Sequence, residues 1–209
     1  EVERHATEIL GGLFSLGGSR DVAMVEACIT SHKELSKVSY QGAPDVRIIM
    51  LHGYPVMAML RVATRQSDGK ANLHQGAIGI GLDLATGESI HAIHHGQSVT
   101  SHPDLDTELI GITVPHWDKV IEMATRGYEM TGLGYLGADL IVDDNSGPVV
   151  IELNARPGLA IQLANATGLK HRFEKVIAQA KAHPNQSWQE RIAFSTGIFG
   201  RKKPADAIL

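Results

Sequence analysis

The chain has 209 residues, 43% of them hydrophobic, and a formal net charge of −4 at pH 7, so it can bury a core in one domain or two small lobes. The weak negative charge gives no reason to expect nucleic-acid binding, and no apolar run is long enough to cross a bilayer. The single cysteine, Cys28, excludes an internal disulfide and suits a reducing compartment, so we expect a cytoplasmic location.

The N-terminal part of the chain predicts helix followed by strands. Residues 7–14 are expected to end a helix, because a pair of glycines follows at 17–18. The β-rich run DVAMVEACI at 21–29 predicts a strand. Residues 46–51 and 56–62 are expected to pair as a hairpin around a Gly- and Pro-containing connection. This order is typical of a mixed α/β chain.

Further along, hydrophobic periodicity and turn residues predict a mobile polar loop at 66–76, strands at 77–83 and 89–94, and helices at 116–131 and 170–182. Gly132 is expected to stop the first of these helices. The sequence becomes polar after residue 183, and residues 184–209 are predicted to form a frayed tail. Four histidines between 91 and 102 match no common zinc site, so we expect them on a strand edge and loop.

A second hairpin is predicted in the stretch GADLIVDDNSGPVVIELNARPG, at 137–158. If Asp143 pairs with Pro148 across its turn, Asp139 lies opposite Glu152, and Asn154 shares their face. Two carboxylates facing each other across a ladder are destabilising, but a hard divalent cation reverses that effect. The open alternatives are a Mg²⁺ site and a solvent-exposed hairpin with charges on its wet face.

These residues resemble the metal-binding signature of the ATP-grasp superfamily, and within it the RimK-like α-L-glutamate ligases. The likeness is carried by Asp139 and by Glu152-x-Asn154-x-x-Pro157-Gly158. It continues in Asp45-Val46-Arg47, the strand 56–60, DGKANLHQG at 68–76, and Thr167-Gly168. The resemblance implies an α/β (α+β) chain with the ATP-grasp fold, in which an antiparallel sheet of the C-terminal lobe is flanked by helices.

The same resemblance implies a domain organisation. Residues 1–30 would be the end of the N-terminal nucleotide-binding lobe with the hinge strand, 31–183 the C-terminal lobe with the metal site, and 184–209 the tail. The lysines and Gly-rich loop that ATP-grasp enzymes place upstream of the hinge are not found before residue 21. We therefore expect an incomplete N-terminal lobe, either because the chain is the C-terminal part of a longer enzyme or because catalysis has been lost.

Roles for individual residues also follow from the resemblance. Asp139, Glu152 and Asn154 would hold Mg²⁺, as two ions, with Mn²⁺ as a substitute. Arg47 would contact phosphate or a substrate carboxylate, with a rim salt bridge to Asp45 or to a neighbouring residue as the alternative.

The remaining candidates lie in loops and in the hinge. Lys70 and Asn72 would close over the triphosphate as a lid, Arg156 would hold a substrate carboxylate, and Glu26 would mark the hinge at the adenine. For Arg61 and Arg65, contact with an anionic substrate and a surface role are equally expected.

The expected function is an ATP-dependent carboxylate–amine ligase that forms an amide bond through an acyl phosphate. It would add L-glutamate to an amine acceptor that the sequence does not identify, either a small molecule or a protein, and related ligases commonly self-associate. Two alternatives stay open: a non-catalytic nucleotide- or metal-binding module, and a dipeptide ligase or another ATP-grasp branch.

Overall fold

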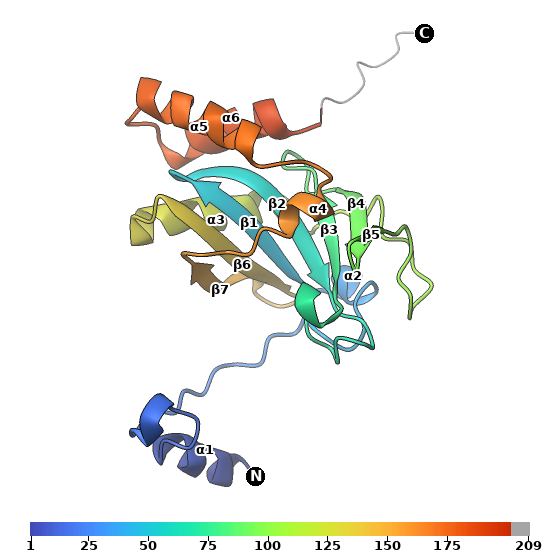
Figure 1. Cartoon of the computed structure of the whole chain (residues 1–209), viewed down its shortest axis with the longest axis vertical. Coiled ribbons are helices and arrows are strands. Elements are labelled where there is room, and N and C mark those ends of the chain that lie inside the picture. The colour runs from blue at the N-terminus through green and yellow to red at the C-terminus, as the bar shows by residue number, and fades with distance from the viewer. Residues whose placement is uncertain (202–209) are drawn as a thin grey trace.

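The computed structural model describes residues 1–201 and is built around one antiparallel sheet. Within these residues the sheet has seven strands in the order β5-β4-β3-β2-β1-β6-β7, with helices on both of its faces (Figure 1). The strands are β1 (Asp45–Leu51), β2 (Tyr54–Val62), β3 (Ile78–Leu82), β4 (Ser89–His94), β5 (Gln97–Ser98), β6 (Tyr135–Asp143) and β7 (Gly147–Asn154). The helices are α1 (Val2–Leu10), α2 (Lys33–Ser36), α3 (Trp117–Thr131), α4 (Ile161–Ala164), α5 (Lys170–Ala182) and α6 (Trp188–Phe199), with 3-10 turns η1 (Leu16–Gly18) and η2 (Leu73–Gln75).

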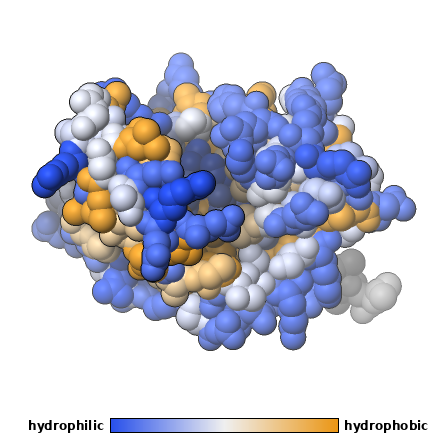
Figure 2. Space-filling view, turned by 90° about the horizontal axis from the view of Figure 1, so that it is seen from below, coloured by the Kyte–Doolittle hydropathy of each residue, from blue (hydrophilic) through white to orange (hydrophobic). Residues whose placement is uncertain are grey.

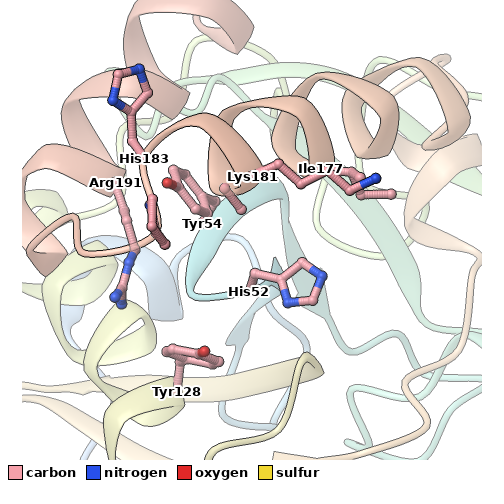
Figure 3. Close-up of a pocket in the computed structure, with 9 residues that line it drawn as sticks. His52, Tyr54, Tyr128, Ile177, Lys181, His183 and Arg191 are labelled. Atoms are coloured by element: carbon pink, nitrogen blue, oxygen red, sulfur yellow. The ribbon is translucent and has the colours of Figure 1, made fainter.

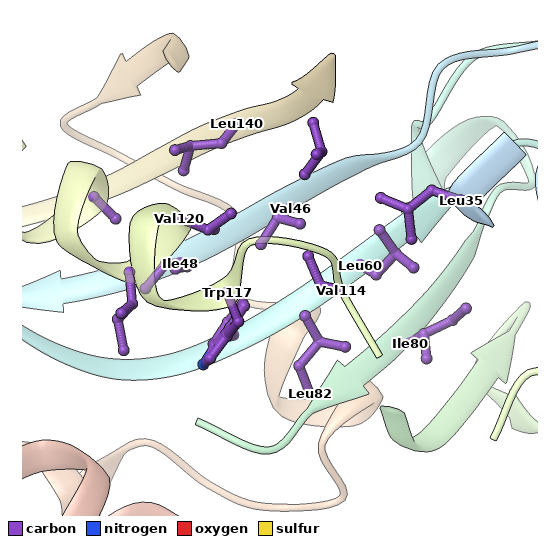
Figure 4. Close-up of a cluster of buried hydrophobic side chains, with 14 of the residues drawn as sticks. Leu35, Val46, Ile48, Leu60, Ile80, Leu82, Val114, Trp117, Val120 and Leu140 are labelled. Carbon is purple, nitrogen blue, oxygen red and sulfur yellow. The ribbon is translucent and has the colours of Figure 1, made fainter. Parts of the chain in front are cut away.

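One face of the sheet is packed against α3 and forms the larger core. Alternate residues of the central strands point to this face, among them Val46, Ile48 and Leu140, and all three are fully buried. Helix α3 meets them with Trp117 and Val120, which lie one turn apart on its buried side (Figure 4). The predicted helix and its stop at Gly132 are confirmed, since α3 ends with Gly132 in the left-handed region.

The opposite face is only partly covered. Ile49, Met57 and Met59 pack there against Ile161 of α4 and Val176 of α5 in a second hydrophobic cluster. The rest of this face, towards the start of β1, carries charged residues instead of apolar ones. The functional candidates therefore lie on the face that α4 and α5 leave partly open.

The segment predicted as a strand at 21–29 is not a strand. It has no regular structure, and its first backbone hydrogen bond to the β6–β7 hairpin comes just after it, from the N–H of Asp144 to the carbonyl of Thr30 at 2.7 Å, beside the Ser31–Asp143 bridge. The prediction was wrong because β propensity needs a partner strand to satisfy the backbone, and Val22, Met24 and Val25 stay exposed instead.

The N-terminal helix ends within the range predicted for a helix end. It spans Val2–Leu10 and therefore stops before the glycine pair at 17–18, and none of its residues is buried. Leu13 and Phe14, beyond its end, are more than 60% exposed. Figure 1 shows this part of the chain projecting from the sheet, and the view from below shows hydrophobic side chains exposed among polar ones (Figure 2).

The predicted frayed tail contains a well-defined helix, α6. Its start has a complete capping box, in which Ser187 and Glu190 satisfy each other's backbone N–H groups. Helix α6 contacts β2 and α3, and Phe194 stacks edge-on against Tyr54. The prediction for residues 202–209 lies outside the described residues.

The two hairpins form where predicted, but each contains a β-bulge. In the first, Leu51 pairs with Tyr54, and a shift after Ile49 leaves the charged ends of β1 and β2 opposite each other. In the second, Asp143 pairs with Gly147 and not with Pro148. A bulge between Asp139 and Leu140 then offsets that difference.

Candidate functional site

The sheet brings two predicted site residues together. Strand β1 lies between β2 and β6, and Arg47 pairs directly with Asp139 across β1 and β6. Asp45 pairs with Arg61 across β1 and β2. Directly paired residues of antiparallel strands point to the same face, so all four side chains lie on the partly open face.

The four charged side chains form one connected ladder of ion pairs. Arg47 binds both carboxylate oxygens of Asp139, with Nε 2.7 Å from Oδ1. Arg61 binds both oxygens of Asp45 and also donates from Nη2 to Oδ2 of Asp139 at 2.8 Å. Two arginines thus share one aspartate, and the fork geometry of each guanidinium fixes the position of that carboxylate.

The ladder is mostly removed from solvent. The side chains of Arg47 and Arg61 are 12% and 13% exposed, and that of Asp139 is 5% exposed. Burial raises the pKa of Asp45 to about 6, although its hydrogen bonds with Arg61 lower it. The pKa of Arg61 is raised by its hydrogen bonds with Asp45 and by both aspartates, which outweigh the opposing effect of burial. Such buried, paired charges at the edge of an open face are typical of sites that recognise charged ligands.

The predicted metal ligands are arranged as the sequence indicated. Asp139 pairs directly with Glu152, and Gly137 pairs with Asn154, so Glu152 and Asn154 share the face of Asp139. Glu152 is exposed and Asn154 is half-buried at the end of β7, where its Oδ1 accepts a hydrogen bond from the backbone N–H of Arg156 at 2.8 Å.

These oxygens fit a hard divalent cation. The ladder uses three of the four lone-pair positions of the Asp139 carboxylate, which leaves one on Oδ1. The Oδ1 atom of Asn154 keeps one lone pair, and both oxygens of Glu152 are without partners among the described residues. Carboxylate and amide oxygens are the donors that Mg²⁺ prefers.

Among the described residues, the other sequence-predicted side chains form no hydrogen bond or ion pair with the ladder. Lys70 and Asn72 are exposed in the loop that follows β2, where Asn72 accepts a hydrogen bond from the backbone of His74 and caps η2. Arg156 is exposed just after β7. Glu26 lies in a shallow cavity of about 370 Å³, together with Asp143 and Ile151 of the β6–β7 hairpin.

The sequence did not predict the position of Arg61 beside Asp139, since a substrate contact and a surface role were equally expected. Its contact with Asp139 spans 78 positions in the chain and requires β1 to lie between β2 and β6. The contact with Asp45, in contrast, could be read from a hairpin register. Arg47 forms its ion pair with Asp139, its neighbour on β6, and not with Asp45, whose carboxylate binds Arg61.

The described residues contain no cluster of three or more His, Cys, Asp or Glu side chains that could hold a metal ion. His102, however, is buried, not exposed on a loop, and contacts the carbonyl of Ala63. Cys28 is exposed. In residues 1–201, no helix combines the length and the apolar character needed to cross a membrane.

Comparison with known proteins places these features in a family. The model of the family described as sugar-transfer associated ATP-grasp matches residues 1–178. No match was found among curated protein sequences. Similar solved structures include the ATP-grasp ligase PsnB complexed with minimal precursor, Mg and ADP, at 18% identity and a TM-score of 0.38 over 68% of this chain and 34% of that one. Another is PsnB with a phosphomimetic variant of the minimal precursor, Mg and ADP, at 17% identity and a TM-score of 0.38 over 67% and 34%.

This chain thus spans about a third of the length of those solved structures. The predicted membership of the ATP-grasp superfamily is confirmed by the family match, whereas the RimK-like branch stays a prediction. The chain belongs to the sugar-transfer associated ATP-grasp family.

Proposed function

We propose that this chain supplies the metal- and phosphate-binding lobe of an ATP-dependent carboxylate–amine ligase. The observation that carries the proposal is the pairing of Asp139 with Glu152, with Asn154 on the same face and two nearly buried arginines beside them. Two carboxylates held opposite each other favour a cation between them, and two guanidiniums next to that cation favour phosphate oxygens.

Each residue has a defined task in this proposal. Asp139, Glu152 and Asn154 would hold Mg²⁺, which neutralises the nucleotide phosphates when it is bound. Arg47 and Arg61 keep the Asp139 carboxylate fixed, so the ligand geometry is set before the substrate arrives. Both side chains lie on the partly open face of the sheet, and the N–H groups that the ladder does not use are suited to a phosphoryl or carboxylate group.

The proposed reaction has two steps. A substrate carboxylate oxygen attacks the γ-phosphorus of ATP, and ADP leaves with formation of an acyl phosphate. An amine then attacks the acyl carbon, phosphate leaves, and the amine loses a proton. The loop that carries Lys70 and Asn72 begins directly after β2, a few residues beyond Arg61, where closure would exclude water from the acyl phosphate.

The finer assignments are part of the same proposal. Glutamate is the proposed donor, Arg156 the proposed contact for a substrate carboxylate, and the acceptor an amine on a small molecule or protein. Residues 1–30, with the hydrophobic side chains exposed around α1, are proposed to belong to the N-terminal lobe and to pack in the intact protein. Glu26, which lies in a cavity beside β7, is proposed to mark the adenine side.

Nucleotide turnover by the intact protein tests the proposal. The assay follows release of ADP and phosphate with Mg²⁺, glutamate and pooled amines, for the native protein, Glu152→Ala, and the matched control Glu174→Ala on the exposed side of α5. Acceptor-dependent ADP release that is lost only in Glu152→Ala supports the ligase. Release of AMP and pyrophosphate would contradict the acyl phosphate route, and Mg²⁺-dependent nucleotide binding without turnover would favour a non-catalytic module.

A further inference from the structure

A second cavity lies at the other end of the sheet, where the β1–β2 turn meets three helices. Its volume is about 350 Å³, within the range of small-ligand sites. Its polar and aromatic lining comes from the turn and β2 (His52 and Tyr54), from α3 (Tyr128), and from α5 and α6 (Lys181 and Arg191). Leu51, beside the turn, pairs with Tyr135, four residues before Asp139, so the cavity lies about 13 Å along the strand from the metal-ligand candidates.

The charged side chains that line the cavity are all basic. None of the described residues around the cavity is acidic, whereas Arg191 and Lys181 are cationic and His52 adds an imidazole. Glu190 precedes Arg191 in the chain, but its carboxylate is engaged by the backbone and hydroxyl of Ser187 in the helix cap. Within residues 1–201, neither Arg191 nor Lys181 forms an ion pair.

Arg191 in particular lacks an acceptor. Its guanidinium lies over the ring of Tyr128, 5.1 Å from the centroid, and its Nη1 is buried without a hydrogen-bond partner among the described residues. Arg172 on α5 shows the usual arrangement, because its Nη1 donates to the carbonyl of Val56 at 2.6 Å. In Arg191, Nη1 is covered by the turn and by the Tyr128 ring, whereas the side chain as a whole is half-buried and lines the cavity. An anion in the cavity would therefore bind the other N–H groups of this guanidinium.

The backbone of the turn holds this arrangement in place. His52 and Gly53 both have positive φ, as a tight two-residue hairpin turn requires. A Cβ on Gly53 would lie 2.7 Å from both Nη1 of Arg191 and Cδ1 of Tyr128, so the backbone of the turn packs closely against both side chains. Figure 3 shows Arg191 and His52 on opposite sides of the space above Tyr128, with Tyr54 above it.

We propose that this cavity is a binding site for a small dianion, held by Arg191, Lys181 and His52 between two tyrosine rings. A phosphoryl group and a dicarboxylate share the required chemistry, since each offers oxygens that a guanidinium can bind in pairs. The site is separate from the Asp139 centre and does not depend on the function proposed for it.

Titration of the intact protein with inorganic phosphate and with glutarate, without nucleotide or Mg²⁺, tests this site. Calorimetry measures affinity, and the NMR signals of the His52 imidazole report location. We expect saturable binding with a shift of the His52 signals, and Lys181→Gln should weaken it about fivefold. Lys175→Gln, an equal change of charge on the exposed side of α5, should leave the affinity unchanged.

The relative affinities for phosphate and glutarate show which of the two ligand classes the site prefers. Tighter binding of phosphate identifies a phosphoryl ligand, and tighter binding of glutarate a dicarboxylate. Arg191→Lys keeps the charge but loses the fork, so it should weaken either ligand while preserving the fold. Binding of neither anion, equal losses in Lys181→Gln and Lys175→Gln, or binding without a shift of His52 would overturn the proposal.

Discussion

The ion-pair ladder should behave as a single coupled unit, and this can be measured as an interaction energy. Among the described residues, Asp139 supplies the one carboxylate that binds Arg47, so Asp139→Asn leaves that guanidinium nearly buried without a counter-charge from this part of the chain. Loss of one partner of a buried pair costs about 3 kcal/mol of unfolding free energy. Arg47→Met should cost less, about 2 kcal/mol, because Arg61 still binds Asp139.

The double variant distinguishes a coupled ladder from independent charges. With both partners removed, no unpaired charge remains at β1, so we expect a total loss of about 3 kcal/mol and an interaction energy of about 2 kcal/mol. Urea unfolding at pH 7 in the presence of EDTA measures all four proteins without a contribution from metal binding. If the two single losses add to within about 0.5 kcal/mol, the pair is not coupled and the reasoning is wrong.

Three further perturbations follow from the structure. Because burial raises the pKa of Asp45 from 3.8 to about 6, its ionisation costs folding free energy, and stability should fall by up to about 3 kcal/mol between pH 4 and 7. Asp45→Asn should flatten that dependence in urea unfolding; an unchanged slope would contradict it. Gly53→Ala should lower the thermal midpoint more than Gly147→Ala, since both have φ +78° but only Gly53 has neighbours within 4 Å, and equal shifts would refute the contact. Ser187→Ala should cost about 1 kcal/mol through the lost α6 cap, and no loss would show that the capping box is dispensable.

Local patterns predicted the parts of the site that lie within one hairpin. The alternation of side chains along β6 and β7 placed Asp139, Glu152 and Asn154 on one face, and the structure agrees. The bulge beside Asp139 was not predictable, because a bulge adds one residue to a strand without a characteristic sequence at this position. The predicted pairing of Asp139 with Glu152 is correct, although the predicted pairing of Asp143 with Pro148 at the turn is not.

Contacts between segments that are distant in the sequence could not be predicted from the sequence pattern. The shared binding of Asp139 by Arg47 and Arg61 depends on the strand order, which hydrophobic periodicity does not specify. The strand predicted at 21–29 is absent for a related reason. Its residues favour a strand, but no neighbouring strand among the described residues pairs with them.

Helix α6 was missed although its start has a recognisable sequence. Ser187 and Glu190 have the spacing of a capping box, but the polar composition around them favoured a tail. The helix packs on β2 and α3 and supplies Arg191 to the second cavity, so one of the more informative parts of the molecule lies in a segment with a weak pattern.

In the function proposed for this chain, the β6–β7 hairpin holds the cation that accompanies the nucleotide. Titration of isotope-labelled protein with ATP and paramagnetic Mn²⁺ can locate that cation, because Mn²⁺ broadens the NMR signals of nearby residues. We expect selective broadening at Asp139, Glu152 and Asn154, and its loss in Glu152→Gln. Broadening centred on the histidines near β4, or none in the hairpin at saturating Mn²⁺ and ATP, would contradict it.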